Sequence, residues 1–262
     1  MRHWITDTIL DFSKRYGVAI LLLAGTGLAT LPPEKSAWNY VKTTMPELSA
    51  ESLSETAGTG VVLGTIGGFR TVLADIAWLR AYHFWSSREL QNCESLMALA
   101  RTLDPQNYFF WENSINYVAF DFPSWIIMDR GGSRVAEKVQ SEIHRKAYEA
   151  ALELIAQMSK RFPGEGKVFA LAAQVTMIKT ALIYGKPDFD RALEFYKKAI
   201  ESRRTPWFCF LSYVNIVRLH FPERIPETRK YFETMRERTQ NRSRKQIITE
   251  ALEELNLPPE SA

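Results

Sequence analysis

The stretch Pro187–Ile200, PDFDRALEFYKKAI, carries the pattern that organises the fold. Small Ala192 is followed four residues later by large Tyr196, and three residues after that by small Ala199. These positions lie on one face of a helix, so a neighbouring helix can approach closely over the alanines and pack against the ring. The other face is charged and suits water. The stretch therefore predicts the second helix of a helix–turn–helix pair.

A similar spacing occurs in two earlier helices. It is found at Cys93, Met97 and Ala100, followed by Pro105, and at Ala151, Ile155 and Met158, followed by Pro163. Proline disfavours helical geometry in the residue before it, so each helix ends there. Apolar residues at helical spacing predict the remaining helices. We expect an all-α fold of about four helix pairs, at 69–103, 107–161, 166–200 and 206–238, with a C-terminal capping helix at 242–255.

One segment interrupts this pattern. Ser124–Ser133, SWIIMDRGGS, is predicted to be an insertion between two helices, with a turn at its two glycines. Its apolar tip, Trp125–Met128, either folds back on the core or offers a surface for a partner or a second copy of the chain.

The spacings resemble the tetratricopeptide repeat (TPR). The first helices add Ala81-x-x-Phe84 and Ala181-x-x-Tyr184, which resemble the small-x-x-aromatic step of that family. The run 67–85, GGFRTVLADIAWLRAYHFW, also looks like a segment of membrane-anchored bacterial repeat proteins of uncharacterised function. The resemblance covers roughly residues 69–238 and implies an anchored, TPR-like α-solenoid that carries out no reaction.

The segment Tyr16–Pro33 contains 18 residues without a charge. As a helix it would span about 27 Å, close to the hydrocarbon thickness of a bilayer. A membrane anchor is the first interpretation; a signal peptide cleaved near Gly27–Ala29 and a buried core helix are the alternatives. Basic residues before the segment keep the N-terminus cytosolic, so the repeat domain is expected in the periplasm, anchored or released by cleavage. The predicted membrane contacts are Val18, Ile20, Leu21, Leu22, Leu23 and Leu28.

The predicted organisation is an anchor or signal segment at 1–33, a linker at 34–68 and a repeat domain at 69–262. The net charge of +3 is small and argues against a dedicated nucleic-acid-binding protein. The two cysteines are too few for a disulfide framework; they are buried free thiols or, in an exported domain, one bridge. None of the four histidines has a second ligand at metal-binding spacing. We expect no catalytic, cofactor or metal site.

Basic clusters at 203–204 and 236–245 are expected to face water, a negatively charged membrane surface or an acidic partner rather than nucleic acid. The predicted function is a membrane-tethered scaffold whose concave groove binds another protein or peptide. The candidate groove residues are Asn113, Asn116, Tyr117, Gln174, Lys179, Tyr213, Asn215 and Arg218; hydrogen bonds inside the helical array are the alternative role for them. A different function, small-ligand binding or catalysis, would use a pocket among the aromatic residues Trp78, Tyr82, Trp85, Trp111 and Tyr117.

Overall fold

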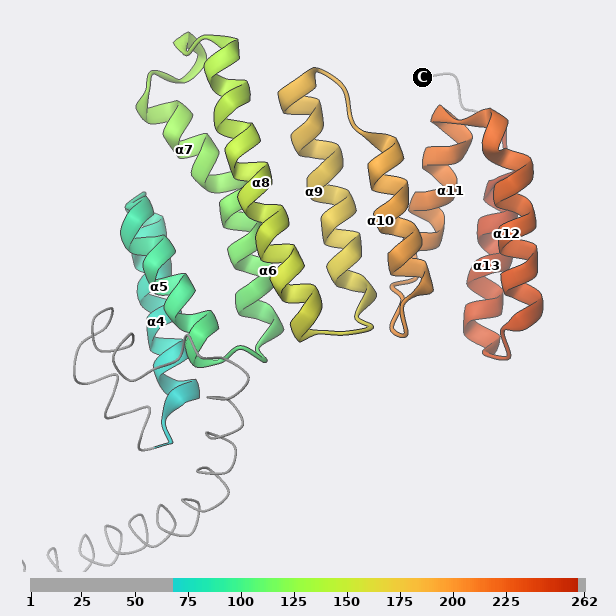
Figure 1. The fold of residues 1–262 in the computed structure, drawn as a ribbon, viewed down its shortest axis with the longest axis horizontal. Coiled ribbons are helices and arrows are strands. Elements are labelled where there is room, and N and C mark those ends of the chain that lie inside the picture. Colours follow the sequence, from blue (N-terminus) through green and yellow to red (C-terminus); the bar gives the residue numbers. More distant parts are fainter. Residues whose placement is uncertain (1–67, 259–262) are drawn as a thin grey trace, which may run out of the picture. The chain divides into compact units, whose positions relative to one another are not determined.

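The computed structural model describes residues 68–258, and all the regular structure in this range is helical (Figure 1). The only β pairing in the described range is one isolated bridge between Glu165 and Arg204. The all-α prediction is therefore confirmed. The predicted anchor or signal segment and the linker up to residue 67 lie outside the described residues. The chain divides into two compact units, Met1–Pro105 and Gln106–Ala262, which are described separately below.

The described part of the first unit is a hairpin of two helices. Helix α4 (Arg70–Ser86) packs against α5 (Leu90–Leu103). Small residues allow the close approach, because Ala74 and Ala81 on α4 and Cys93 and Ala100 on α5 are fully or almost fully buried. The turn between the helices places Arg88 in the left-handed region, with φ of 59°.

The second unit consists of helices that pack mainly against their neighbours in the chain. The elements are α6 (Tyr108–Asn116), the π-helical turn η1 (Tyr117–Asp121), α7 (Phe122–Asp129), the 3₁₀ turn η2 (Gly132–Arg134), α8 (Glu137–Arg161), α9 (Gly166–Tyr184), α10 (Phe189–Glu201), α11 (Phe208–His220), the 3₁₀ turn η3 (Pro222–Arg224), α12 (Ile225–Arg238) and α13 (Arg242–Glu254). Helices α8, α9 and α10 run side by side in alternating directions (Figure 1).

The predicted insertion at Ser124–Ser133 is wrong in its first half. Residues up to Asp129 belong to α7, which continues from α6 through the π-helical turn η1. The wider π turn precedes Pro123, which has no N–H to donate and lies in the first turn of α7, so the chain remains helical. The expected turn lies at Gly131, with φ of 114°, and Gly132. Of the apolar tip, Met128 is exposed, while Trp125 is half-buried and packs on the ring of Phe122.

One hydrophobic cluster of the second unit extends from α9 to α13. The predicted packing face of α10 is confirmed, because Ala192, Tyr196 and Ala199 are all buried in this cluster. The side chain of Asp188 caps α10 by accepting a hydrogen bond from the N–H of Arg191. Helix α9 is long and apolar enough to cross a membrane, but more than half of its apolar window is buried inside the protein. It is therefore the central core helix of this unit.

The C-terminal helix α13 contributes Ile248, Ala251 and Leu252 to the same core and packs on α11 and α12. Its first turn is capped by the side chain of Asn241. Both cysteines are buried free thiols in the structure. Burial raises the pKa of the Cys209 thiol to about 12.

Candidate functional site

The predicted groove residues fall into two groups, one on the surface and one inside the helical array. On α9, Gln174 is exposed to solvent. On α11, Asn215 and Tyr213 are half-buried, and Tyr213 packs edge-on against Phe232. On α6, Asn113 is half-buried and its amide donates to the carbonyl of Phe109 one turn earlier. Asn116 and Tyr117 are half-buried beside or within the π-helical turn.

Lys179 lies inside the array instead of on its surface. Its side chain is 1% exposed, and its Nζ lies 3.2 Å from His144 Nδ1 on α8 and 5.3 Å from the centre of the Phe120 ring in η1. Burial lowers the pKa of Lys179 to about 8. Burial, and then the nearby ammonium, lower the pKa of His144 to about 4. At neutral pH the neutral imidazole therefore accepts a hydrogen bond from the lysine.

Arg218 is also engaged within the protein. It is buried, and its guanidinium forms an ion pair with Glu254 at 3.0 Å and donates to the carbonyl of Pro258 at 2.8 Å. The same guanidinium donates to the side-chain oxygen of Asn215 at 3.2 Å. These contacts tie α11 to the end of α13. For Lys179 and Arg218, the observed contacts are hydrogen bonds inside the array, which the sequence left as the alternative role, whereas the contact of Asn215 is with Arg218 on the same helix.

The surface of α9 and α11 carries an apolar row that the sequence prediction missed. Gln174, Ile178 and Leu182 follow each other at four-residue intervals along one face of α9, and Ile178 and Leu182 are 40% and 48% exposed. On α11, Phe208 and Leu219 are exposed and, by helical spacing, share one face with Asn215. The four-residue spacing of Gln174, Ile178 and Leu182 is the sequence signal that could have revealed this row.

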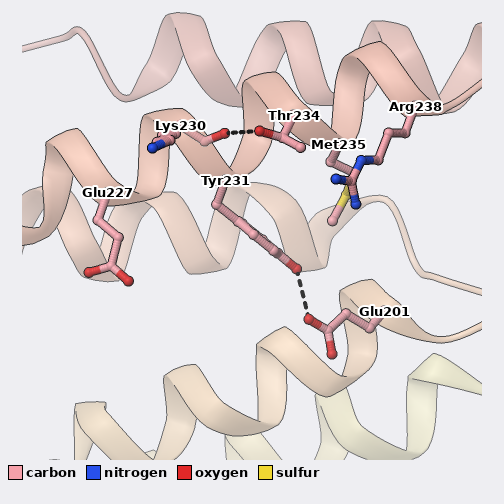
Figure 2. A pocket seen from close by; sticks show the side chains of 7 residues that line it. All are labelled: Glu201, Glu227, Lys230, Tyr231, Thr234, Met235 and Arg238. Atoms are coloured by element: carbon pink, nitrogen blue, oxygen red, sulfur yellow. Dashed lines mark hydrogen bonds between the residues drawn. The ribbon is translucent and has the colours of Figure 1, made fainter.

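A shallow cleft of about 480 Å³ lies between the end of α10 and the outer face of α12. Figure 2 shows Tyr231 pointing from α12 toward Glu201 at the end of α10, and its hydroxyl donates to the Glu201 carboxylate at 3.2 Å. Burial, followed by the nearby Glu201 carboxylate, raises the pKa of Tyr231, so the phenol stays protonated. Lys230 and Arg238 add positive charge to the rim and Glu227 adds negative charge. These groups offer hydrogen bonds and charges to a ligand.

The aromatic residues of the alternative pocket belong to two units. On α4, Trp78 is buried while the rings of Tyr82 and Trp85 stack with their centres 5.4 Å apart. On α6, Trp111 is buried in the second unit. The prediction of a pocket among these rings stays a prediction. Within residues 68–258, no group of three or more histidine, cysteine, aspartate or glutamate side chains is arranged to hold a metal ion.

Comparison with known proteins adds no assignment: no protein-family model, no curated protein and no solved structure matches this chain. The function is therefore argued from the geometry described above.

Proposed function

We propose that this protein is a membrane-tethered interaction scaffold, in which helix pairs stack as a TPR-like α-solenoid and the first helix of each pair binds a partner. The neighbour-to-neighbour packing of α8, α9, α10 and α11 supports the stack, since each element of a solenoid contacts mainly the adjacent elements, and α13 packs on both α11 and α12 as a capping helix would. The buried small-and-large positions in α5, α8 and α10 support TPR-like pairing within it. The uncharged segment at 16–33 supports the tether.

The observation that carries the proposal is the exposed apolar row on α9. A helix with more than half of its apolar window buried exposes Ile178 and Leu182 next to the amide of Gln174. Helix α11 runs in the same direction as α9, because each is antiparallel to α10. The stacked rings of Phe189, at the start of α10, and His220, at the end of α11, lie 3.8 Å apart, which brings the C-terminal ends of α9 and α11 to the same edge.

Two parallel helices with exposed apolar and amide side chains suit an amphipathic partner helix or an extended peptide. The apolar side chains would supply buried area, and Gln174 and Asn215 would read the partner's backbone. The alternative of a small-ligand pocket has less support, because the rings of Trp78 and Trp111 are already buried within their own units.

Site-specific photo-crosslinking in intact cells tests this assignment. A photoreactive amino acid at Ile178 or Leu182 is expected to give a defined adduct with another protein. The matched control is Glu194, an exposed position on α10, a second helix. Adding Gln174→Ala to the Leu182 probe should lower the adduct yield. Equal adducts from all three positions, or none from α9, would refute the assignment of the first-helix face.

A further inference from the structure

The turns at one end of the second unit bring basic side chains together. The α8–α9, α10–α11 and α12–α13 turns lie at the same end of the helices (Figure 1). Backbone hydrogen bonds of 2.9 Å join the first two turns, from Gly166 N–H to the Arg204 carbonyl and from Arg204 N–H to the Gly164 carbonyl. Arg244, at the start of α13, donates to the carbonyl of Ile200 at the end of α10. We call residues 160–167, 198–207 and 235–245 the basic end.

The charge of the basic end far exceeds that of the chain. It holds eleven lysines and arginines and three glutamates, a net charge of +8, whereas the whole chain has +3. The opposite end of the unit, comprising 129–138, 184–191, 220–227 and 250–258, holds six basic and nine acidic residues, a net charge of −3. The basic residues of the basic end are Lys160, Arg161, Lys167, Lys198, Arg203, Arg204, Arg236, Arg238, Arg242, Arg244 and Lys245.

Most of these cations point into solvent. Arg203, Arg242 and Lys245 are exposed, and the side chain of Arg204 is 81% exposed with its nearest carboxylate, that of Glu165, 3.7 Å away. Among the described residues, this is the one ion pair within 4 Å that involves a side chain of the basic end. A high density of uncompensated positive charge attracts anions from a distance.

An exposed tryptophan lies within the same surface. Trp207 follows the α10–α11 turn and is 62% exposed, with the neighbouring Phe208 ring edge-on to it. A tryptophan flanked by arginines is the side-chain combination found where proteins meet the headgroup layer of a bilayer, because the indole is apolar with one polar N–H. A cleft of about 580 Å³ between α12 and α13 is lined by Arg236, Arg242 and Lys245 together with Glu237.

We propose that the basic end lies on a membrane surface rich in anionic phospholipid, with Trp207 entering the headgroup layer and the arginines and lysines contacting lipid phosphates. The charges are spread over three turns at the same end of the unit, which suits a planar anionic surface. Single-stranded nucleic acid is bound along grooves in which several rings stack successive bases, and here the exposed rings are two adjacent residues, Trp207 and Phe208, packed edge-on to each other. The basic residues and Trp207 are not part of the apolar row on α9, so the inference does not depend on the proposed partner or on the tether.

The test uses the full chain reconstituted into vesicles of phosphatidylcholine, with or without phosphatidylglycerol, in which the lipid tails carry bromine. Bromine quenches tryptophan fluorescence on contact, and the difference between the native chain and Trp207→Phe isolates the signal of Trp207. The quenching of Trp207 fluorescence obtained in this way should be large with phosphatidylglycerol, small without it and reduced by added salt. Near an anionic surface each basic residue contributes roughly fivefold to binding, so Arg203→Glu/Arg242→Glu/Lys245→Glu should abolish the difference.

The matched control is Lys138→Glu/Lys186→Glu, which reverses two exposed lysines at the opposite end and should leave the quenching unchanged. Far-UV circular dichroism of each variant establishes that it is folded. Quenching of Trp207 that is equal in both lipid mixtures, or that survives the triple substitution in a folded chain, would overturn the proposal. Tight binding to a short single-stranded DNA or a polyglutamate peptide, without quenching by phosphatidylglycerol vesicles, would also overturn it and would assign the surface to that class of partner.

Discussion

Replacement of Lys179 by methionine tests the placement of this side chain between α8 and α9. Lys179 is 1% exposed, and in the described part of the chain no carboxylate lies within ion-pair distance of it. Burial lowers its pKa from 10.5 to about 8. At about 1.4 kcal/mol per pH unit, holding the charged lysine inside the folded protein at pH 7 costs about 3 kcal/mol.

Methionine keeps the length of the side chain and removes its charge. It also removes the hydrogen bond to His144, which is worth about 1 kcal/mol. The variant should therefore be more stable than the native chain at pH 7, by about 1–2 kcal/mol. In the native chain the pKa of Lys179 is lower in the folded state than in the unfolded state. Between pH 8 and pH 10.5 the unfolded chain therefore binds more protons. Stability of the native chain rises as the pH increases through this range, by about 1 kcal/mol between pH 7 and pH 9, and this contribution is absent from Lys179→Met.

Urea unfolding followed by far-UV circular dichroism at pH 7 and pH 9 measures both effects. Subtracting the unfolding free energy of the variant from that of the native chain at each pH removes the contributions of other titrating groups. Lys167→Met, at an exposed position of the same helix, is the matched control and should change neither the free energy of unfolding nor its pH dependence. A destabilised Lys179→Met protein at pH 7, or parallel pH profiles for the two chains, would refute the reasoning. The crosslinking yield from Leu182 should be the same in both chains, because Lys179 does not reach the surface.

Two further substitutions probe the packing that holds the second unit together. A methyl group added in Gly166→Ala would lie 2.7 Å from the Arg204 carbonyl and 2.8 Å from that of Ala199, so we expect thermal unfolding to show a loss of about 1–3 kcal/mol despite the gain in helix propensity. A stability equal to or above the native value would contradict this packing. Arg218→Met leaves Glu254 without its buried partner, and the loss of about 2 kcal/mol weakens the docking of α13. Limited proteolysis should therefore cut near residue 255 at least tenfold faster. An unchanged cleavage rate would mean that this ion pair does not hold the C-terminus.

The helices themselves could be predicted because their signals are local. The predicted bounds 166–184 coincide with α9, where a glycine lies at each end and apolar residues repeat between them. The positions Ala192, Tyr196 and Ala199 are buried as predicted, since any helix with that spacing must hide one face. The π-helical turn η1 could not be predicted in this way, because one wider turn changes the phase of the apolar pattern without leaving a residue signature.

The orientation of polar side chains on apolar helices was harder to predict. Lys179 follows Val175 and Thr176 by four and three residues, which places it on the buried face of α9, whereas Gln174 and Ile178 share the exposed face. Helical spacing alone could have separated these two groups. The partners of Lys179 and Arg218 could not be predicted, because His144 and Glu254 lie more than 30 residues away along the chain.

The basic clusters at 203–204 and 236–245 could be recognised in the sequence, but their meeting with 160–167 at one end of the second unit depends on the topology. The three segments of the basic end carry net charges of +2, +2 and +4 and are about 40 residues apart, and the two stretches between them, 168–197 and 208–234, carry only +1 each. In an antiparallel helical array, every second turn returns to the same edge, and charges that alternate along the chain become separated in space. The spacing of charged segments along the chain, compared with the length of one helix pair, therefore decides whether charges of one sign collect at one end of the folded unit or spread evenly over it. Here the basic segments recur at about that length, which gives one end of the second unit an electrostatic potential that composition does not reveal.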